Sequence, residues 1–566
     1  MRVALLVASV VALLSGCASP APGGQATPSG GSAPSAPKRI LATIIDEPVA
    51  FNGIMAFNRG GGNDAMEELL HAGAANVDGN GRLRPQLAES VPTVENGLWK
   101  LSADGQMETT WRLKAEARWQ DDAPVTADDL VFTLQVGQDR ELPVRGHLGY
   151  QALDRVERVD ERTVTVKWRR PFIGADRLFT RDFAMPLPRH LLDRAYVDDR
   201  VNFGQLPYWS HEFVGTGPFK LKEWARGSHL VLAANDGYVL GRPRVDDIVV
   251  KFIGEPNTIV ASLLSGAVEL TLGRNLTLEP AIEIRDQWRD GRLELAFKSW
   301  IMMYPQLLTP NPVVVGDVQF RRALLHALDR QQMVDALQGG LVPIAHMMIS
   351  PDIPEYRDSD ESIMRYEYDP RRAAQIIESL GYSRGADGIH RDAAGQRLVV
   401  EARTSAGEDV FAKSLLSVAD YWQRAGVAVE PNIVPRQLDQ DLEYRSNFPG
   451  FALTRQPNEL EALGDHRSSQ APVPETNYQG RNRARYTNVE FDGLIDRFFT
   501  TIPQAERSTI VRQIMRHITE NLTMMGLFYN TEPTLVGHRL TNVFARTGEG
   551  STHAWNAEQW DTRAVS

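Results

Sequence analysis

The residues with the potential for chemistry are chiefly carboxylates, and their spacing argues against catalysis. Adjacent pairs occur at Asp121-Asp122 and Asp128-Asp129. A glycosidase needs two carboxylates that face one sugar bond, whereas neighbouring residues point to opposite sides of a strand or lie about 100° apart on a helix. These pairs therefore indicate turn and helix-start residues. The sequence also contains no HExxH, GxSxG or GxxxxGK[ST] motif, and its 12 histidines lack the i, i+4 pairing of metal sites.

A glycine-rich stretch is the first candidate binding element. It reads Arg59-Gly-Gly-Gly-Asn63 and precedes a predicted helix. Its backbone N–H groups are therefore suited to an anion or a ligand carboxylate, the alternative being a flexible turn. A second candidate is the weakly charged segment that contains Trp300 and Tyr304. Aromatic side chains there either line an apolar cleft or belong to the core.

The single cysteine, Cys17, directly follows a segment that resembles a signal peptide. The apolar run 3–14 reaches about 18 Å as a helix, which is short of the roughly 30 Å hydrocarbon core of a bilayer. Leu14-Ser15-Gly16-Cys17 resembles the bacterial lipobox, in which the preceding segment is cleaved and the cysteine is acylated. Residues 1–16 are therefore expected to be a lipoprotein signal peptide, with Cys17 as the lipidation site.

Residues 17–38 are expected to form a lipid-anchored flexible linker. Residues 18–37 carry no charge and are almost all Ala, Ser, Pro or Gly. Such a segment cannot bury enough apolar surface to offset its ordering entropy. The signal peptide and the linker together predict an exported protein, periplasmic or at the cell surface, that a lipid anchors to the membrane.

The body of the chain has the composition of a globular protein with more than one lobe. Hydrophobic residues make up 42% of the 566 residues and charged residues 23%. The net charge of −11 argues against nucleic-acid binding, which needs a positive surface. One cysteine allows neither an intramolecular disulfide nor a cysteine-based zinc site. Strand-like runs such as 40–45 alternate irregularly with helical runs at roughly 317–338 and 504–522, which predicts a mixed α/β fold.

Six segments, in order along the body, carry the motifs of one protein family. They begin at Leu83 (LRPQLAES), Ala117 (ARWQDDAPVTADDLVF), Gly215 (GTGPFK), Asp317 (DVQFRRALLHALDR), Tyr368 (YDPRRAA) and Asn482 (NRARYTNVEFD). Together they resemble the family 5 extracellular solute-binding proteins of ABC importers, which include oligopeptide- and dipeptide-binding proteins. Asp122 stands where the family usually has Gly, and Gln319 replaces an Arg of its pattern. The resemblance spans about 40–540.

This resemblance implies a two-lobed α/β fold of the periplasmic-binding-protein type II, with an extra N-terminal subdomain and a ligand cleft between the lobes. Hinge closure on the ligand would present a surface to a membrane permease. The expected boundaries are 39–58 with 206–290 and 525–566 for the discontinuous lobe I, 59–205 for the subdomain and 291–524 for lobe II.

The partners that the resemblance implies are a small peptide or peptide-like solute and the permease subunits of an ABC importer. The protein is expected to be a monomer without cofactor or metal, and not an enzyme. In oligopeptide-binding members, an Asp in a late W-x-x-D-Y-x-x-P-like segment holds the α-amino group of the peptide. The corresponding stretch, 448–461, lacks both that Trp and that Asp. Asn458 and Glu459 are the candidate substitutes. Arg455 is a candidate partner for a ligand carboxylate or phosphate, the alternative being a solvated loop arginine.

Three classes of function stay open at this point. The first is the lipid-anchored receptor of an ABC importer, for a peptide-like solute or, alternatively, for an oligosaccharide, an opine-like conjugate or a metal chelate. The second is an exported hydrolase that uses paired carboxylates on polymers. The third is a lipoprotein sensor or chaperone without a transport role. The ordered motifs favour the first.

Overall fold

The computed structural model describes residues 37–55, 62–102, 105–144, 147–273, 275–546 and 552–563. The chain separates into two units, Met1–Pro37 and Lys38–Ser566, and the second is the folded body. The predicted signal peptide, Cys17 and Arg59 lie outside the described residues. Within the described ranges, no helix combines the length and the apolar character needed to cross a bilayer.

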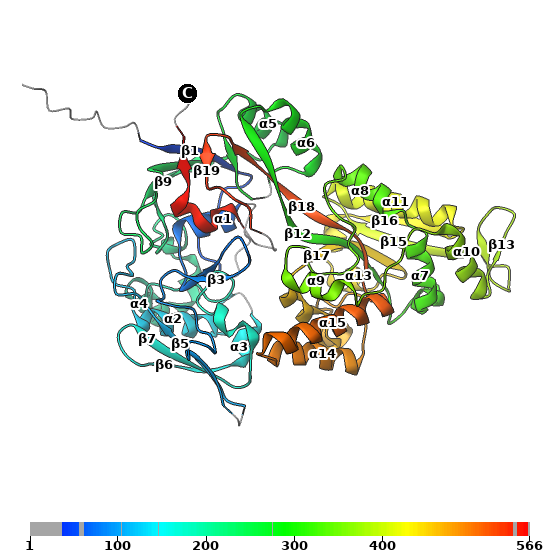
Figure 1. Ribbon diagram of the computed structural model, residues 1–566, viewed down its shortest axis with the longest axis horizontal. Helices are drawn as coiled ribbons and strands as arrows, with labels where there is room; N and C mark the ends of the chain where they lie inside the picture. The colour runs from blue at the N-terminus through cyan, green and yellow to red at the C-terminus, as the bar shows by residue number, and fades with distance from the viewer. Residues whose placement is uncertain are drawn as a thin grey trace, which may run out of the picture. The chain divides into compact units, whose positions relative to one another are not determined.

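A ten-stranded sheet extends through the body, in the order β16-β15-β17-β12-β18-β11-β1-β10-β9-β8 (Figure 1). Its strands are β1 (Arg39–Ile44), β8 (Phe219–Ala225), β9 (His229–Ala234), β10 (Asp247–Phe252), β11 (Leu270–Thr271), β12 (Gly291–Pro305), β15 (Val399–Ser405), β16 (Ala428–Val434), β17 (Phe451–Pro457) and β18 (Met525–Gly537). The long strands β12 and β18 pair antiparallel with each other and connect the two halves of the sheet.

The predicted strand at 40–45 is β1, which lies inside the sheet. It pairs in parallel with β10 and with β11. Ile40, Ala42 and Ile44 are fully buried at alternate positions, as the two-residue period of a strand requires. These side chains belong to a hydrophobic cluster that also contains residues of helix α1 (Asn63–Leu70).

A four-stranded sheet, β4-β5-β7-β6, forms a smaller layer together with its helices. The elements are β4 (Trp99–Leu101), β5 (Met107–Arg112), β6 (Leu153–Arg158), β7 (Thr163–Trp168), α2 (Ala127–Gly137), α3 (Leu148–Ala152) and α4 (Arg189–Asp198). The predicted helix start at Asp128-Asp129 is confirmed, because both residues lie in the first turn of α2, where the backbone N–H of Thr126 donates to Asp129 Oδ2 at 2.7 Å. Asp122 lies in a turn with a φ of 70°, a conformation that glycine adopts without strain.

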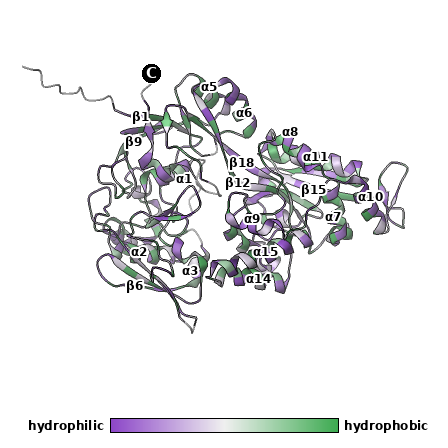
Figure 2. Ribbon diagram, viewed as in Figure 1, coloured by the Kyte–Doolittle hydropathy of each residue, from purple (hydrophilic) through white to green (hydrophobic). Residues whose placement is uncertain are grey.

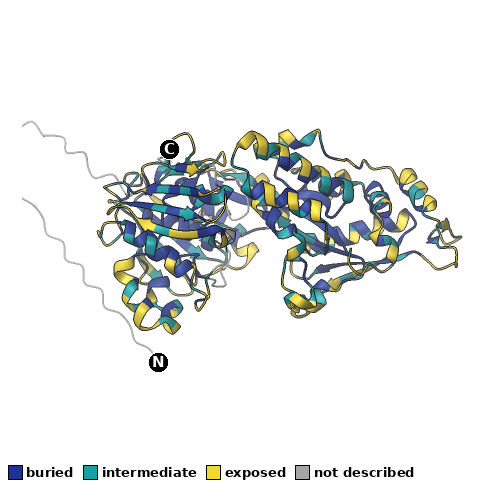
Figure 3. Ribbon diagram, turned by 90° about the horizontal axis from the view of Figure 1, so that it is seen from below, coloured by how far each residue is buried: buried dark blue, intermediate teal, exposed yellow. Residues whose placement is uncertain are grey.

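The second half of the large sheet is covered by helices. They are α7 (Val318–His326), α8 (Arg330–Gln338), α9 (Pro354–Asp360), α10 (Pro370–Ser379), α11 (Asp409–Arg424), α14 (Val489–Thr500) and α15 (Gln504–Asn521). The predicted helix at 317–338 is interrupted between His326 and Arg330, where Asp329 accepts a hydrogen bond from the N–H of Gln332 and caps a new helix. The helices carry both hydrophobic and hydrophilic residues and turn their exposed residues outward (Figures 2 and 3).

Strand β12 supplies side chains to two hydrophobic clusters. Trp300, Met302 and Tyr304 belong to a cluster that includes residues of α14 and α15. Ile301 and Met303 belong to another, which includes residues of α7 and α11. The alternation of side chains along the strand therefore gives this half of the sheet a core on each face.

Shorter elements complete the body. They are β2 (Ala75–Val77), β3 (Leu83–Pro85), α5 (Pro256–Leu264), α6 (Leu278–Gln287), β13 (Ser383–Arg384), β14 (His390–Arg391), α12 (Arg436–Asp439), α13 (Leu442–Ser446), β19 (Leu540–Thr541) and β20 (Asp561–Thr562). The lobe boundaries given above stay predictions; two of them coincide with the first residues of β12 and β18.

Candidate functional site

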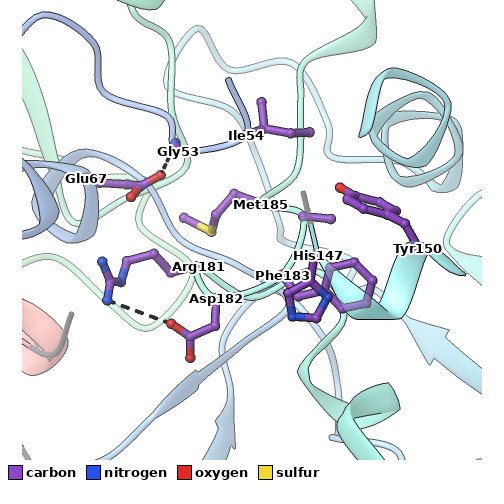
Figure 4. A pocket seen from close by; sticks show the side chains of 10 residues that line it. Gly53, Ile54, Glu67, His147, Tyr150, Arg181, Asp182, Phe183 and Met185 are labelled. Carbon is purple, nitrogen blue, oxygen red and sulfur yellow. Dashed lines mark hydrogen bonds and ion pairs between the residues drawn. The ribbon is translucent and has the colours of Figure 1, made fainter. Parts of the chain in front are cut away.

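A pocket lies beside helix α1 (Figure 4). It leaves about 340 Å³ of empty space, part of it open to solvent. Gly53 and Ile54 come from the loop after β1, Glu67 from α1, His147 and Tyr150 from the start of α3, and 181–185 from the loop before α4. Four segments that are distant in sequence therefore meet at one pocket.

Carboxylates and a guanidinium form one side of this pocket. Glu67 is fully buried and accepts a hydrogen bond from the N–H of Gly53 at 2.5 Å. Arg181 pairs with Asp64 (Nη1–Oδ1 3.1 Å) and with Glu68 (Nε–Oε1 3.3 Å). Burial opposes the charge of Arg181, but these carboxylates, with Asp182, hold its pKa above the usual value. Asp182 is the most accessible of the acids that line the pocket, with 38% of its side chain exposed.

Aromatic rings form the other side. The ring of His147 stacks on Phe183 with centroids 3.9 Å apart, and Tyr150 meets Phe183 edge-on at 5.0 Å. Burial raises the pKa of the Tyr150 hydroxyl, so this group stays neutral near pH 7. Figure 4 shows Glu67 and Tyr150 on opposite sides of Met185.

An ion pair links the C-terminal segment to helix α1. Arg546 Nη2 lies 3.3 Å from Glu68 Oε1, and Arg546 Nη1 donates to the carbonyl of Val77 at 2.9 Å. Thr552 Oγ1 also donates to Glu68. The side chains of Arg546 and Glu68 are each 5% exposed. Neither charged group can therefore lose its partner without a large desolvation cost.

Arg177 connects the pocket loop to the segment after β17. Its Nη1 lies 3.3 Å from Asp182 Oδ2, and its Nε lies 3.4 Å from Glu461 Oε1. Glu461 is the largest cause of the raised pKa of Arg177, and Glu459 contributes as well. Burial raises the pKa of the neighbouring Asp176 to about 6. The predicted residue Glu459 therefore belongs to the electrostatic surroundings of Arg177.

The two predicted asparagines are buried without hydrogen-bond partners for their amides. Asn63 is the first residue of α1 and is 1% exposed; Asn458 directly follows β17 and is fully buried. Among the described residues, neither the amide oxygen nor the amide nitrogen of either side chain has a partner. Such groups are rare in folded proteins, because each costs free energy until it is paired.

The remaining predicted residues gather on β12 and β17. Trp300 and Tyr304 are buried in the core, with the indole N–H and the phenol hydroxyl unpaired within the described part of the chain. Arg455 lies in β17 opposite Ile301, and its Nη1 pairs with Glu408 Oε1 at 3.3 Å. It is thus a strand residue with a carboxylate partner and not a solvated loop arginine.

Tyr304 also borders a second, smaller cavity with about 190 Å³ of empty space. His466 and Thr523 face it too, and the Thr523 hydroxyl has no partner among the residues that the structure describes. Burial lowers the pKa of His466 to about 4, so its ring is neutral.

Sequence reasoning missed the pocket residues Glu67, Tyr150, Arg181 and Asp182. Glu67 had a signal, because it follows Asn63 by one helical turn and shares its helix face. The segment 181–185 carries no motif, and only the fold brings it to α1. Among the described residues, no group of three or more His, Cys, Asp or Glu side chains is placed to hold a metal ion.

Known structures identify the class of this fold. The oligopeptide-binding protein from Thermus thermophilus, complexed with a pentapeptide, matches with a TM-score of 0.70 and 23% identity over 93% of this chain and 96% of that one. NikA from Brucella suis, in complex with Fe(III)-EDTA, matches with a TM-score of 0.75 and 16% identity over 93% and 100%. The fold is therefore that of the two-lobed α/β solute-binding proteins, as predicted.

The family follows from the sequence. The model of the bacterial extracellular solute-binding proteins, family 5, matches residues 82–459, and the chain belongs to this family. The oligopeptide-binding protein AppA from Bacillus subtilis (strain 168) is 24% identical over 500 residues, which are 87% of this chain and 86% of that protein. The predicted recognition is confirmed: the chain is a solute-binding protein of the ABC-importer type and not an enzyme.

Proposed function

We propose that this protein captures a peptide or peptide-like solute between its lobes and delivers it to the permease of an ABC importer. A lipid on Cys17 holds it at the membrane, in the periplasm or at the cell surface. Among the residues predicted from the sequence, Asn458 is the foremost ligand-binding residue, with Glu459 beside it.

The observation that supports a peptide-like ligand is the buried amide of Asn458. It lies in the stretch where oligopeptide-binding relatives hold their ligand, and its oxygen and nitrogen both lack partners among the described residues. An amide offers one acceptor and one donor group, which matches the N–H and C=O of a peptide unit. A carboxylate has no proton to donate to a peptide C=O and suits the ammonium end better. The replacement of the expected Asp by Asn thus favours recognition of peptide groups over recognition of a free amine.

Native mass spectrometry of residues 39–566 tests this proposal, first on the protein as purified and then with pooled peptides. A one-to-one adduct of peptide mass, weakened at least tenfold in Asn458→Ala, is the expected result. Asn202→Ala is the control, because Asn202 is exposed and its side chain pairs with its neighbour Asp199. A mass that peptides leave unchanged, together with an adduct from pools of oligosaccharides or metal chelates, would refute the peptide assignment.

A further inference from the structure

We propose that the second cavity, which Tyr304 borders, binds an ordered water molecule that bridges the hydroxyl groups of Tyr304 and Thr523. This inference concerns the interior of the folded body and does not depend on which solute the protein captures. Three observations support it: a cavity of sufficient size, two buried hydroxyls without partners among the described residues, and a chain reversal next to one of these hydroxyls.

The cavity lies where four segments of the chain meet. They are the end of β12 with Tyr304, the 3₁₀ helix Leu460–His466, the loop 482–486 before α14, and the link between α15 and β18 with Thr523 and Met524. The empty space of about 190 Å³ has room for a water molecule, whose share of the volume of liquid water is about 30 Å³. Cavities that stay empty in proteins are apolar, whereas this one is bordered by polar side chains.

The two hydroxyl groups are buried and unpaired within the ranges that the structure describes. Tyr304 is fully buried, and Thr523 is 4% exposed. A buried hydroxyl without a hydrogen bond costs free energy, and for this reason most such groups in folded proteins are paired with protein atoms or with ordered water. Each hydroxyl can donate one hydrogen bond and accept two, so one water molecule between them satisfies both.

The other polar groups of the lining favour a neutral molecule. The amide of Asn482 is already paired, because its nitrogen donates to the carbonyl of Tyr486 at 2.8 Å and its oxygen accepts from the N–H of Tyr486 at 3.3 Å. The Tyr486 hydroxyl lies 2.9 Å from Nε2 of His517. His466 is neutral, since burial lowers its pKa to about 4, and its ring offers water one donor and one acceptor. Among the described residues of the lining there is no Asp, Glu, Lys or Arg that would hold an ion.

The water bridge would also stabilise a reversal of the chain. Directly after α15, Leu522 adopts the left-handed conformation, with a φ of 47° and a ψ of 48°, and β18 begins three residues later. This conformation is unfavourable for a residue other than glycine and persists where the surroundings fix it. Thr523 is the next residue. Met525 of β18 pairs with Met303 of β12, which directly precedes Tyr304. A bridge from Thr523 to Tyr304 therefore connects the reversal to the strand with which β18 pairs.

Removal of each hydroxyl at nearly constant shape distinguishes a hydrated cavity from a dry one. Thr523→Val and Tyr304→Phe should each raise the equilibrium constant of unfolding about fivefold, because a hydrogen bond to water is lost with the hydroxyl. The double variant should raise it by less than the product of the two single effects, since the first substitution already breaks the bridge. Ser414→Ala is the matched control. Ser414 is a fully buried residue of α11, its hydroxyl has no partner in the described part of the chain, and it lines neither cavity, so its removal should not raise the constant.

Urea unfolding of the purified protein, followed by tryptophan fluorescence, measures these constants, and circular dichroism verifies that each variant folds. A crystal structure of the wild type that resolves ordered water gives the direct readout, one molecule at about 2.5–3.0 Å from both Tyr304 Oη and Thr523 Oγ1. The proposal is overturned if both variants behave like Ser414→Ala, or if no water density lies between the two oxygens. Strictly additive effects of the two substitutions would also overturn it, because the hydroxyls would then have separate partners.

Discussion

The buried histidine His71 makes the stability of the body depend on pH in a defined direction. It is 1% exposed, its Nε2 lies 2.8 Å from the carbonyl of Pro186, and its Nδ1 lies 3.3 Å from the backbone N–H of Thr216. The carbonyl requires a proton on Nε2, and the N–H requires a lone pair on Nδ1. The neutral ring satisfies both, whereas a second proton on Nδ1 would oppose the N–H of Thr216 and would have to be accepted by the Thr216 hydroxyl, 2.9 Å from Nδ1. Burial lowers the pKa of His71 from 6.5 to about 4.

The sign of this pH dependence follows from the difference between the pKa of His71 in the folded chain and in the unfolded chain. Below pH 6.5 the histidine of the unfolded chain binds a proton, while that of the folded chain stays neutral down to about pH 4. The stabilisation that neutral His71 provides is therefore present above pH 6.5 and is lost as the pH falls toward 4. Between about pH 7.5 and about pH 5 the loss amounts to about 2 kcal/mol of unfolding free energy.

Urea unfolding of residues 39–566, followed by tryptophan fluorescence at several pH values in this range, measures the effect. In His71→Gln the side chain keeps a donor for Pro186 but no longer titrates, so the fall in unfolding free energy should be smaller by about 2 kcal/mol. His211→Gln should leave the pH dependence unchanged, because His211 is exposed. If wild type and His71→Gln lose stability in parallel, His71 is not buried as a neutral ring.

Three further outcomes are expected. Cys17→Ala should release the protein from membranes without loss of the fold, as fractionation and circular dichroism would show; retention in the membrane fraction would contradict lipid anchoring. Glu68→Gln should lower the unfolding free energy by about 3–5 kcal/mol, because Arg181 and Arg546 then lose a buried partner. Trp422→Ala should cost a similar amount, about 3–5 kcal/mol, since its indole is fully buried and its N–H donates to the carbonyl of Leu324 at 3.0 Å. A loss below about 1 kcal/mol in urea unfolding, for either of the last two, would contradict the packing described.

The sequence predicted local structure well where a short pattern of apolar or capping residues is enough to determine a strand or a helix start. The short apolar run 40–45 placed β1, and the pair Asp128-Asp129 placed the start of α2. The break at Asp329 was missed because the apolar period continues through it, although Asp is a good cap for a new helix. Periodicity reports which face is buried and not where the helix axis turns.

The site was less accessible to sequence reasoning. Asn458 and Glu459 were found only through their position in a family motif. Arg181 and Asp182 are distant from α1 in the sequence and come close to it only in the folded chain. No residue type or spacing in their segment predicts this contact. For Trp300 the sequence left open whether the side chain lines a cleft or belongs to the core, and in the structure it is buried in β12.

The place of β1 in the large sheet has a mechanical consequence. The strand begins one residue after Lys38, where the body begins, and β10 flanks it along its whole length, with β11 on the other edge. A force applied to Lys38 along the axis of β1 loads these hydrogen bonds together, in shear. A strand at the edge of the sheet, pulled across its axis, would release its bonds one at a time. Lys38 adds a clamp at the point of attachment, because its Nζ pairs with Asp561 at 2.6 Å and its backbone N–H donates to Asp246 at 2.8 Å. The body is thus built to resist pulling at the end where the predicted tether enters.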